Sequence, residues 1–123
     1  MEDDDLRGYV FSEIPSGEKI LKEGILKTMS LLRGSSAAAR MVYKYALTEK
    51  GVWMRSRGSF LSKGKTTFMA YTDLDHYEVR PYFEQPSYIF FPKGGRQPGN
   101  RIFFDDSDEV LKVLDMFLTR MNE

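Results

Sequence analysis

Half of the chain's cations lie in three stretches that contain no carboxylate. These stretches are residues 33–40, 55–65 and 93–101, and they hold nine of the eighteen Lys and Arg side chains. Arginine forks and the backbone amides of glycine-bearing loops are suited to binding phosphate and carboxylate groups. If the fold brings the three stretches to one rim, we expect a surface that binds an anionic membrane or an acidic protein segment. The nine candidate ligand-binding residues are Arg33, Arg40, Arg55, Arg57, Lys63, Lys65, Lys93, Arg96 and Arg101.

Two apolar residues, Phe60 and Leu61, lie between the cations of the second stretch. Apolar area flanked by cations is typical of modules that attach to anionic surfaces. We therefore predict that Phe60 and Leu61 contact a lipid interface or a partner's pocket. The alternative interpretation is that they fold back onto the core, and that Lys and Arg only keep a hairpin tip soluble.

His76 is the only histidine, and it lies among Asp73, Asp75 and Glu78. In a strand, alternation places His76 and Glu78 on one face and Asp75 on the other, so at most two ligands would converge. The chain also has no cysteine. We expect no catalytic residue, no metal site and no cofactor. A small enzyme that uses His76 with Asp73 or Glu78 is the least favoured alternative.

The charges are balanced overall but not along the chain. Eighteen basic residues match eighteen acidic ones, which argues against a surface made for nucleic acid. Residues 1–18 hold one basic and six acidic side chains, and residues 105–123 hold two and six, which leaves fifteen basic and six acidic side chains between them. We expect an anionic partner to meet this middle part.

The sequence carries no sign of export or of membrane insertion. The absence of cysteine favours a reducing compartment. The apolar runs are far shorter than the roughly 18 residues that span a bilayer, and residues 1–5 are acidic, unlike a signal peptide. We expect a cytoplasmic protein without a transmembrane segment, and attachment to the inner membrane face is the alternative.

Alternation of side chains predicts seven strands that would position these groups. Residues 19–32 fit either a helix or a strand interrupted at Gly24, and consistency with the rest of the fold favours a strand. A chain of 123 residues is expected to form one domain. Seven strands predict a mainly β fold, an antiparallel sandwich or partly open barrel. The other six strands are expected at 41–47, 52–57, 66–71, 74–80, 87–91 and 101–104.

The last element changes period and is predicted to be a helix. Asp106 or Ser107 provides its cap, so we interpret Asp105 and Asp106 as a strand end and a helix cap and not as paired catalytic carboxylates. An apolar stripe at helical spacing must be buried, so we expect the helix to cap the open end of the sandwich. The stripe consists of Val110, Leu111, Val113, Leu114, Phe117, Leu118 and Met121.

Four short strings are similar, in order and spacing, to the bacterial pleckstrin-homology-like family, which itself resembles GRAM domains. They are Gly-Glu-Lys-Ile-Leu from residue 17, Tyr-Ala-Leu-Thr-Glu-Lys-Gly-Val from 45, Tyr-Thr-Asp-Leu from 71 and Ile-Phe-Phe-Asp-Asp from 102. We therefore assign residues 17–123 to the domain and residues 1–16 to an acidic N-terminal tail. The resemblance implies a scaffold that binds phosphoinositides, peptides or proteins, without catalysis. It also implies that the third basic stretch lies near the other two.

A self-associating scaffold without an external ligand is the second interpretation. A homo-oligomer of this kind would use exposed sheet edges or the apolar residues of the tail, which are Tyr9, Phe11 and Ile14. Tyr82 and Phe83 lie between two prolines. We interpret them as core residues, with an exposed contact patch as the alternative.

Overall fold

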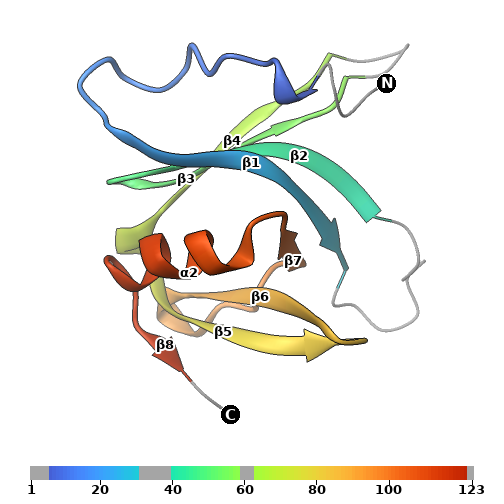
Figure 1. The fold of residues 1–123 in the computed structure, drawn as a ribbon. Helices are drawn as coiled ribbons and strands as arrows, with labels where there is room; N and C mark the ends of the chain where they lie inside the picture. The colour runs from blue at the N-terminus through green and yellow to red at the C-terminus, as the bar shows by residue number, and fades with distance from the viewer. Residues whose placement is uncertain (1–5, 31–39, 59–62, 122–123) are drawn as a thin grey trace.

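A computed structural model gives the positions of residues 6–30, 40–58 and 63–121, with Arg40 described by its backbone only. Over these residues the chain forms one curled sheet of eight strands and one C-terminal helix, α2 (Figure 1). The strand order is β4-β3-β2-β1-β7-β6-β5-β8. The elements are β1 (Ile20–Met29), β2 (Arg40–Thr48), β3 (Gly51–Ser56), β4 (Thr66–Ala70), β5 (Leu74–Tyr82), β6 (Gln85–Pro92), β7 (Arg101–Phe104), α2 (Ser107–Asp115) and β8 (Arg120–Met121), with short 3₁₀ turns η1 (Tyr71–Asp73) and η2 (Lys93–Gly95).

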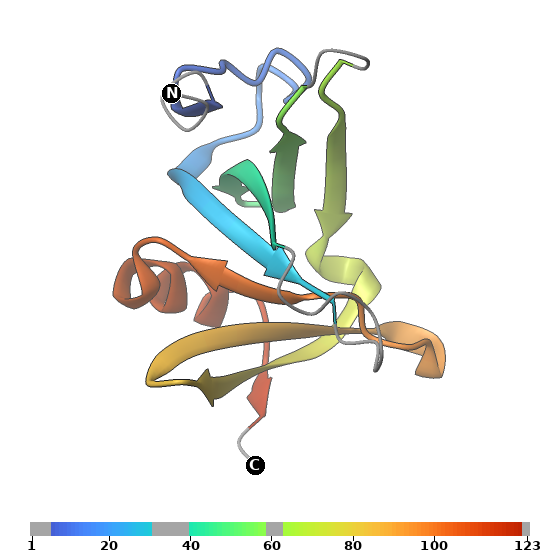
Figure 2. The same cartoon turned by 90° about the vertical axis from the view of Figure 1, so that its right-hand side faces the viewer.

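Strand β1 belongs to both halves of the sheet. It pairs with β2 along its length and with β7 only from Leu26 to Met29. Because a long twisted strand changes direction along its length, β1 can pass from one half to the other. As a result, β1 to β4 lie over β5 to β7, and the apolar faces of the two halves enclose the core (Figures 1 and 2).

Two core tyrosines hold the two ends of α2. The Tyr88 hydroxyl forms a hydrogen bond with the Ser107 hydroxyl at 2.5 Å, and the Tyr77 hydroxyl donates to Asp115 Oδ1 at 2.5 Å. Ser107 and Asp115 are the first and last residues of the helix. A buried hydroxyl left without a partner costs about 1–3 kcal/mol. These bonds therefore fix the position of the helix, in addition to the packing of its apolar stripe.

The prediction of a mainly β chain with a C-terminal helix is confirmed. A strand is present at each of the seven predicted places, and the ambiguous stretch 19–32 contains β1. Of the two predicted architectures, a sandwich and a partly open barrel, the structure is closer to the second: a single sheet curls into a half-barrel, because β1 is hydrogen-bonded to a strand on each side.

The prediction of seven antiparallel strands missed one element. An eighth strand, β8, pairs with β5 in parallel, Tyr77 with Arg120 and Glu78 with Met121. Met121 of β8 had been predicted to belong to the apolar stripe of the helix. A two-residue strand has no periodicity of its own, so only its pairing with β5 defines it.

Helix α2 is shorter than its predicted stripe. It ends at Asp115, and the backbone N–H groups of Phe117 and Leu118 both donate to the carbonyl oxygen of Leu114, at 3.0 and 2.8 Å. The Phe117 ring then stacks on Tyr71, with 4.7 Å between ring centroids. The end of the stripe is thus buried by a tertiary contact and not by a continued helix.

Candidate functional site

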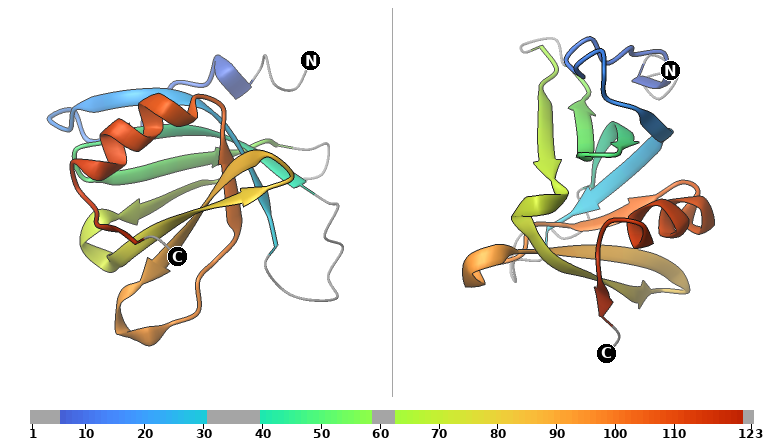
Figure 3. Two further views of the ribbon diagram at one scale, coloured as in Figure 1. Left: turned by 60° about the horizontal axis from the view of Figure 1, so that its bottom comes forward. Right: turned by 90° about the vertical axis from the view of Figure 1, so that its left-hand side faces the viewer.

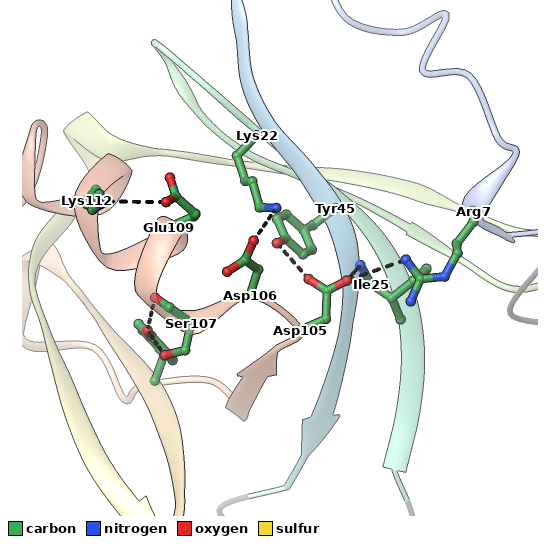
Figure 4. A network of polar contacts seen from close by, with 10 residues as sticks. Arg7, Lys22, Ile25, Tyr45, Asp105, Asp106, Ser107, Glu109 and Lys112 are labelled. Atoms are coloured by element: carbon green, nitrogen blue, oxygen red, sulfur yellow. Dashed lines mark hydrogen bonds and ion pairs between the residues drawn. The ribbon is translucent and has the colours of Figure 1, made fainter.

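Asp105 lies where β7 meets α2 and binds three other segments of the chain (Figure 4). Its Oδ1 accepts a hydrogen bond from the Tyr45 hydroxyl at 2.9 Å, and its Oδ2 accepts one from the backbone N–H of Ile25 at 3.0 Å. The Arg7 guanidinium lies 3.5 Å from Oδ2. Burial, reinforced by the charge of Asp105, raises the pKa of Tyr45 well above its usual value. Both oxygens of Asp105 are therefore engaged in holding the fold together.

Gly24 in β1 makes room for this carboxylate. A β-carbon at position 24 would lie 2.7 Å from the Tyr45 hydroxyl oxygen and closer still to Asp105 Oδ1. We expect Gly24→Ala to lower the free energy of unfolding by about 2 kcal/mol, because the added methyl group displaces two groups of a packed network.

Urea denaturation measures the effect of Gly24→Ala, and Gly17→Ala is the matched control. No atom lies within 4 Å of a carbon added at Gly17, so we expect a change below about 0.5 kcal/mol there. Equal losses in the two variants would contradict the steric role of Gly24.

Asp106 is the N-cap residue of α2, as its sequence position predicted. Its carboxylate accepts a hydrogen bond from Lys22 Nζ at 2.9 Å. The bond from Lys22 lowers the pKa of Asp106. Asp105 and Asp106 thus bind different partners, and they do not form a paired carboxylate site (Figure 4).

Residues 6–18, which include most of the predicted acidic tail, run over the outer side of the β1 to β4 half (Figures 1 and 3). Leu6 and Phe11 are buried there. Lys44 Nζ donates a hydrogen bond to the carbonyl oxygen of Tyr9 at 2.5 Å. The segment from Leu6 onward is therefore packed against the sheet through apolar and polar contacts.

Glu13 of this segment is bound at the base of the β3–β4 hairpin, by which we mean the pair Arg55 and Thr66 next to the connecting loop. Its Oε2 accepts hydrogen bonds from the Tyr9 hydroxyl at 2.7 Å, the Thr66 hydroxyl at 2.8 Å and Arg55 Nη1 at 3.4 Å. The Arg55 guanidinium also lies over the Tyr9 ring, 4.4 Å from its centroid. The bond from Tyr9, assisted by Thr66 and Arg55, lowers the pKa of Glu13. The hairpin base thus already holds one carboxylate, supplied by the chain itself.

The predicted cations that the structure describes do not form a single rim. Lys93 lines a pocket with Glu49 and Lys50 of the β2–β3 turn. This turn lies at the start of β3, whereas the β3–β4 loop with its cations follows the other end of the strand. The β6–β7 connection, with exposed Arg96, lies far from the hairpin (Figures 2 and 3). The expected closeness of the second and third stretches is thus absent, because η2 follows β6 in the other half of the sheet. The hairpin itself carries Arg55, Arg57, Lys63 and Lys65.

Arg101 begins β7 and is held by neighbouring side chains. Its guanidinium lies 4.9 Å from the centroid of the Tyr82 ring, and its Nη1 donates to Ser87 Oγ at 2.7 Å. Its backbone pairs with Met29, the residue that pairs on its other side with Arg40. Arg33, Phe60, Leu61 and the side chain of Arg40 lie outside the described residues.

His76 contacts both neighbouring carboxylates, which strict alternation did not predict. Its Nδ1 lies 2.7 Å from Asp75 Oδ2, its Nε2 lies 3.6 Å from Glu78 Oε2, and its ring stacks on Phe91. The register of β5 with β6 shifts between Leu74 and His76, and such a bulge breaks the alternation of side chains. Across the described part of the chain, no three or more His, Asp or Glu side chains are grouped to hold a metal ion.

The tip of the β5–β6 hairpin is a two-residue turn formed by Phe83 and Glu84. Both residues have positive φ, 48° and 68°, a conformation that costs residues other than glycine about 1–2 kcal/mol each. Phe83 is 86% exposed, so its interpretation as a core residue is wrong. Tyr82 is half-buried and packs on the Phe103 ring. Positive φ at both positions is common in tight two-residue hairpin turns, and the exposure of the Phe83 ring is what makes it a candidate contact residue.

A pocket of about 480 Å³ lies between η1, the start of β5 and the segment that follows α2. Its polar lining includes Lys50 and Lys93. Its apolar lining is formed by Tyr71, Leu74, Phe117 and Leu118.

No helix among residues 6–30, 40–58 and 63–121 is long and apolar enough to cross a membrane. Compared with family models, curated proteins and solved structures, the chain has no significant match to any of them.

Proposed function

We propose that the protein is a non-enzymatic binding module of the pleckstrin-homology-like kind, which holds an acidic segment of a partner protein at its β3–β4 hairpin. The observation that carries the proposal is the Glu13 carboxylate, which accepts hydrogen bonds from Thr66 and Arg55 at the base of the hairpin. Tyr9 contributes a third hydrogen bond and an aromatic face for Arg55. The N-terminal segment thus offers the same groups that we propose for the ligand, a carboxylate (Glu13) close to an aromatic ring (Tyr9).

The charge of the hairpin extends beyond the place that Glu13 occupies. Arg57, Lys63 and Lys65 are exposed, and the sequence from 55 to 65 contains no carboxylate. A cluster of like charge attracts an oppositely charged segment and speeds its encounter with the protein. In this proposal the N-terminal segment competes with the partner for Arg55 and Thr66, and the exposed cations make the first contact.

The fold gives a second, independent line of support. A mainly β chain that ends in a helix is compatible with the scaffold that the resemblance to the pleckstrin-homology-like family implies. That family provides a scaffold for binding without catalysis. Because fold alone does not define a ligand, the acidic segment is inferred from the contacts of Glu13.

A fluorescent peptide of ten glutamates is the probe that tests the proposal, read by fluorescence anisotropy. We expect its Kd to rise steeply with salt concentration. Lys63→Glu with Lys65→Glu should raise the Kd about tenfold, since two exposed charges contribute about 1.4 kcal/mol together. Glu13→Gln should lower the Kd, because it releases Arg55 and Thr66. Lys112→Glu, an exposed lysine on α2, is the matched control and should have little effect.

The same variants are measured on vesicles that contain phosphatidylserine. A peptide Kd that changes neither with salt concentration nor in the hairpin variants would contradict the proposal. Binding to vesicles without binding to the peptide would replace the acidic segment by a membrane surface as the ligand. Circular dichroism of each variant verifies that the fold is retained.

A further inference from the structure

The exposed tip of the β5–β6 hairpin is held rigidly before it meets any partner. Pro81 and Pro86 face each other across the hairpin next to the turn, where each ring restricts its own backbone. The edge of the Phe83 ring packs against Tyr82, with 4.7 Å between centroids. Arg101 in turn covers the Tyr82 ring. A contact residue that is fixed in advance loses little entropy on binding, which favours affinity.

The pocket of about 480 Å³ offers matching chemistry at the opposite end of β5. Strand β5 starts at Leu74, which lines the pocket, and ends at Tyr82, beside the tip (Figure 1). The accessible aromatic part of the pocket is the half-buried Phe117 ring, which stacks on the buried Tyr71 ring with 4.7 Å between centroids. An aromatic ring such as Phe83 packs favourably on such a surface.

The charges around the pocket favour the binding of an anionic group. Of its two carboxylates, Glu49 accepts a bond from the Lys19 backbone N–H at 3.4 Å, and Asp75 is bound to His76 at 2.7 Å. By contrast, the side chains of Lys50 and Lys93 have no hydrogen-bond or ion-pair partner within the described part of the chain.

At the tip, the Glu84 carboxylate likewise has no partner among the described residues. One end of β5 therefore presents an unpaired carboxylate beside an exposed ring. The other end presents two unpaired ammonium groups beside an apolar pocket.

We propose that the β5–β6 tip of one copy of this chain inserts into the pocket of a second copy. Phe83 packs on Phe117 and Leu118 of the second copy, and Glu84 pairs with its Lys50 and Lys93. Because tip and pocket lie at opposite ends of β5, each copy uses its tip on one neighbour and offers its pocket to another. Such a head-to-tail contact builds a chain or a closed ring of copies. This association involves neither Glu13 nor the β3–β4 hairpin, so it is independent of the proposed function.

Sedimentation velocity on the full chain tests the proposal at concentrations up to about 1 mM, where weak protein contacts become populated. The wild-type protein is expected to grow in mass with concentration. The tip variant, Phe83→Asn with Glu84→Gln, and the pocket variant, Lys50→Glu with Lys93→Glu, should each remain monomeric. An equimolar mixture of these two variants should form dimers that grow no further, because only one intact tip and one intact pocket remain per pair.

Three further samples complete the experiment. Glu84→Lys combined with Lys50→Glu and Lys93→Glu in one chain should restore association, since the charges are exchanged. Val10→Ala removes an apolar side chain that is 79% exposed elsewhere and should leave the wild-type behaviour unchanged. Lys63→Glu with Lys65→Glu should also associate normally, which separates this proposal from the binding function. A wild-type protein that stays monomeric at about 1 mM, or association that persists in the tip variant, would overturn the proposal.

Discussion

Asp105→Ala is expected to lower the free energy of unfolding by about 3 kcal/mol. The substitution removes the acceptor of the Tyr45 hydroxyl and of the Ile25 N–H. The Tyr45 side chain is fully buried, so the substitution leaves its hydroxyl without its protein partner at the edge of the core. A hydrogen bond to a charged group contributes about 1.5–3 kcal/mol, and a buried donor left alone costs a similar amount. Urea denaturation followed by tryptophan fluorescence measures the loss, because the single Trp53 lies in β3.

Two comparisons make the Asp105 result specific. Asp105→Asn keeps one acceptor oxygen and is expected to lose about half as much stability as Asp105→Ala. Asp108→Ala removes an exposed carboxylate from the first turn of α2 and should cost no more than about 0.5 kcal/mol, the scale of a helix-dipole contact. If Asp105→Ala and Asp108→Ala were equally mild, Asp105 would not hold the strands and the helix together.

Leu114→Ala is expected to be at least as damaging, with a loss of about 3–4 kcal/mol in the free energy of unfolding. The Leu114 side chain is fully buried in the core between α2 and the sheet. Its carbonyl oxygen also accepts the two N–H groups that close the helix. Removing a buried leucine side chain costs the lost burial and leaves a cavity, about 2–5 kcal/mol in total. Chemical denaturation of the variant measures the change.

Met116→Ala is the matched control for the helix. Met116 lies two residues beyond Leu114 and is 65% exposed, so we expect a change of less than about 0.5 kcal/mol. A Leu114→Ala variant as stable as Met116→Ala would mean that α2 does not contribute to the core. The half-barrel would then have to be stable without its helix.

The strands and the start of the helix were predicted from the sequence because their signals are local. Side chains alternate along 41–47, where Tyr43, Tyr45 and Leu47 share one face, and this pattern depends only on strand geometry. In the structure, Tyr45 and Leu47 are fully buried. The helix start at Asp106 was likewise visible, since a cap followed by acidic residues is a property of one turn.

The places where prediction failed depend on contacts between distant segments. Strand β8 exists only because residues after α2 meet β5. Asp75 contacts His76 at a place where the register of β5 with β6 shifts, so strict alternation did not predict the contact. Phe83 has the composition of a core residue, yet its position in a two-residue turn leaves it in solvent.

The candidate site shows the same division. Local sequence patterns were enough to predict the three cation-rich stretches, the mainly β chain and the amphipathic helix near its C-terminus. Two features followed only from the folded chain. Lys93 lies near the start of β3, far from the loop that joins β3 to β4, and Glu13 binds Arg55 across 42 residues of sequence. The physical reason is that side-chain periodicity is set within a few residues. The meeting of two segments depends instead on the direction in which every strand between them runs and twists.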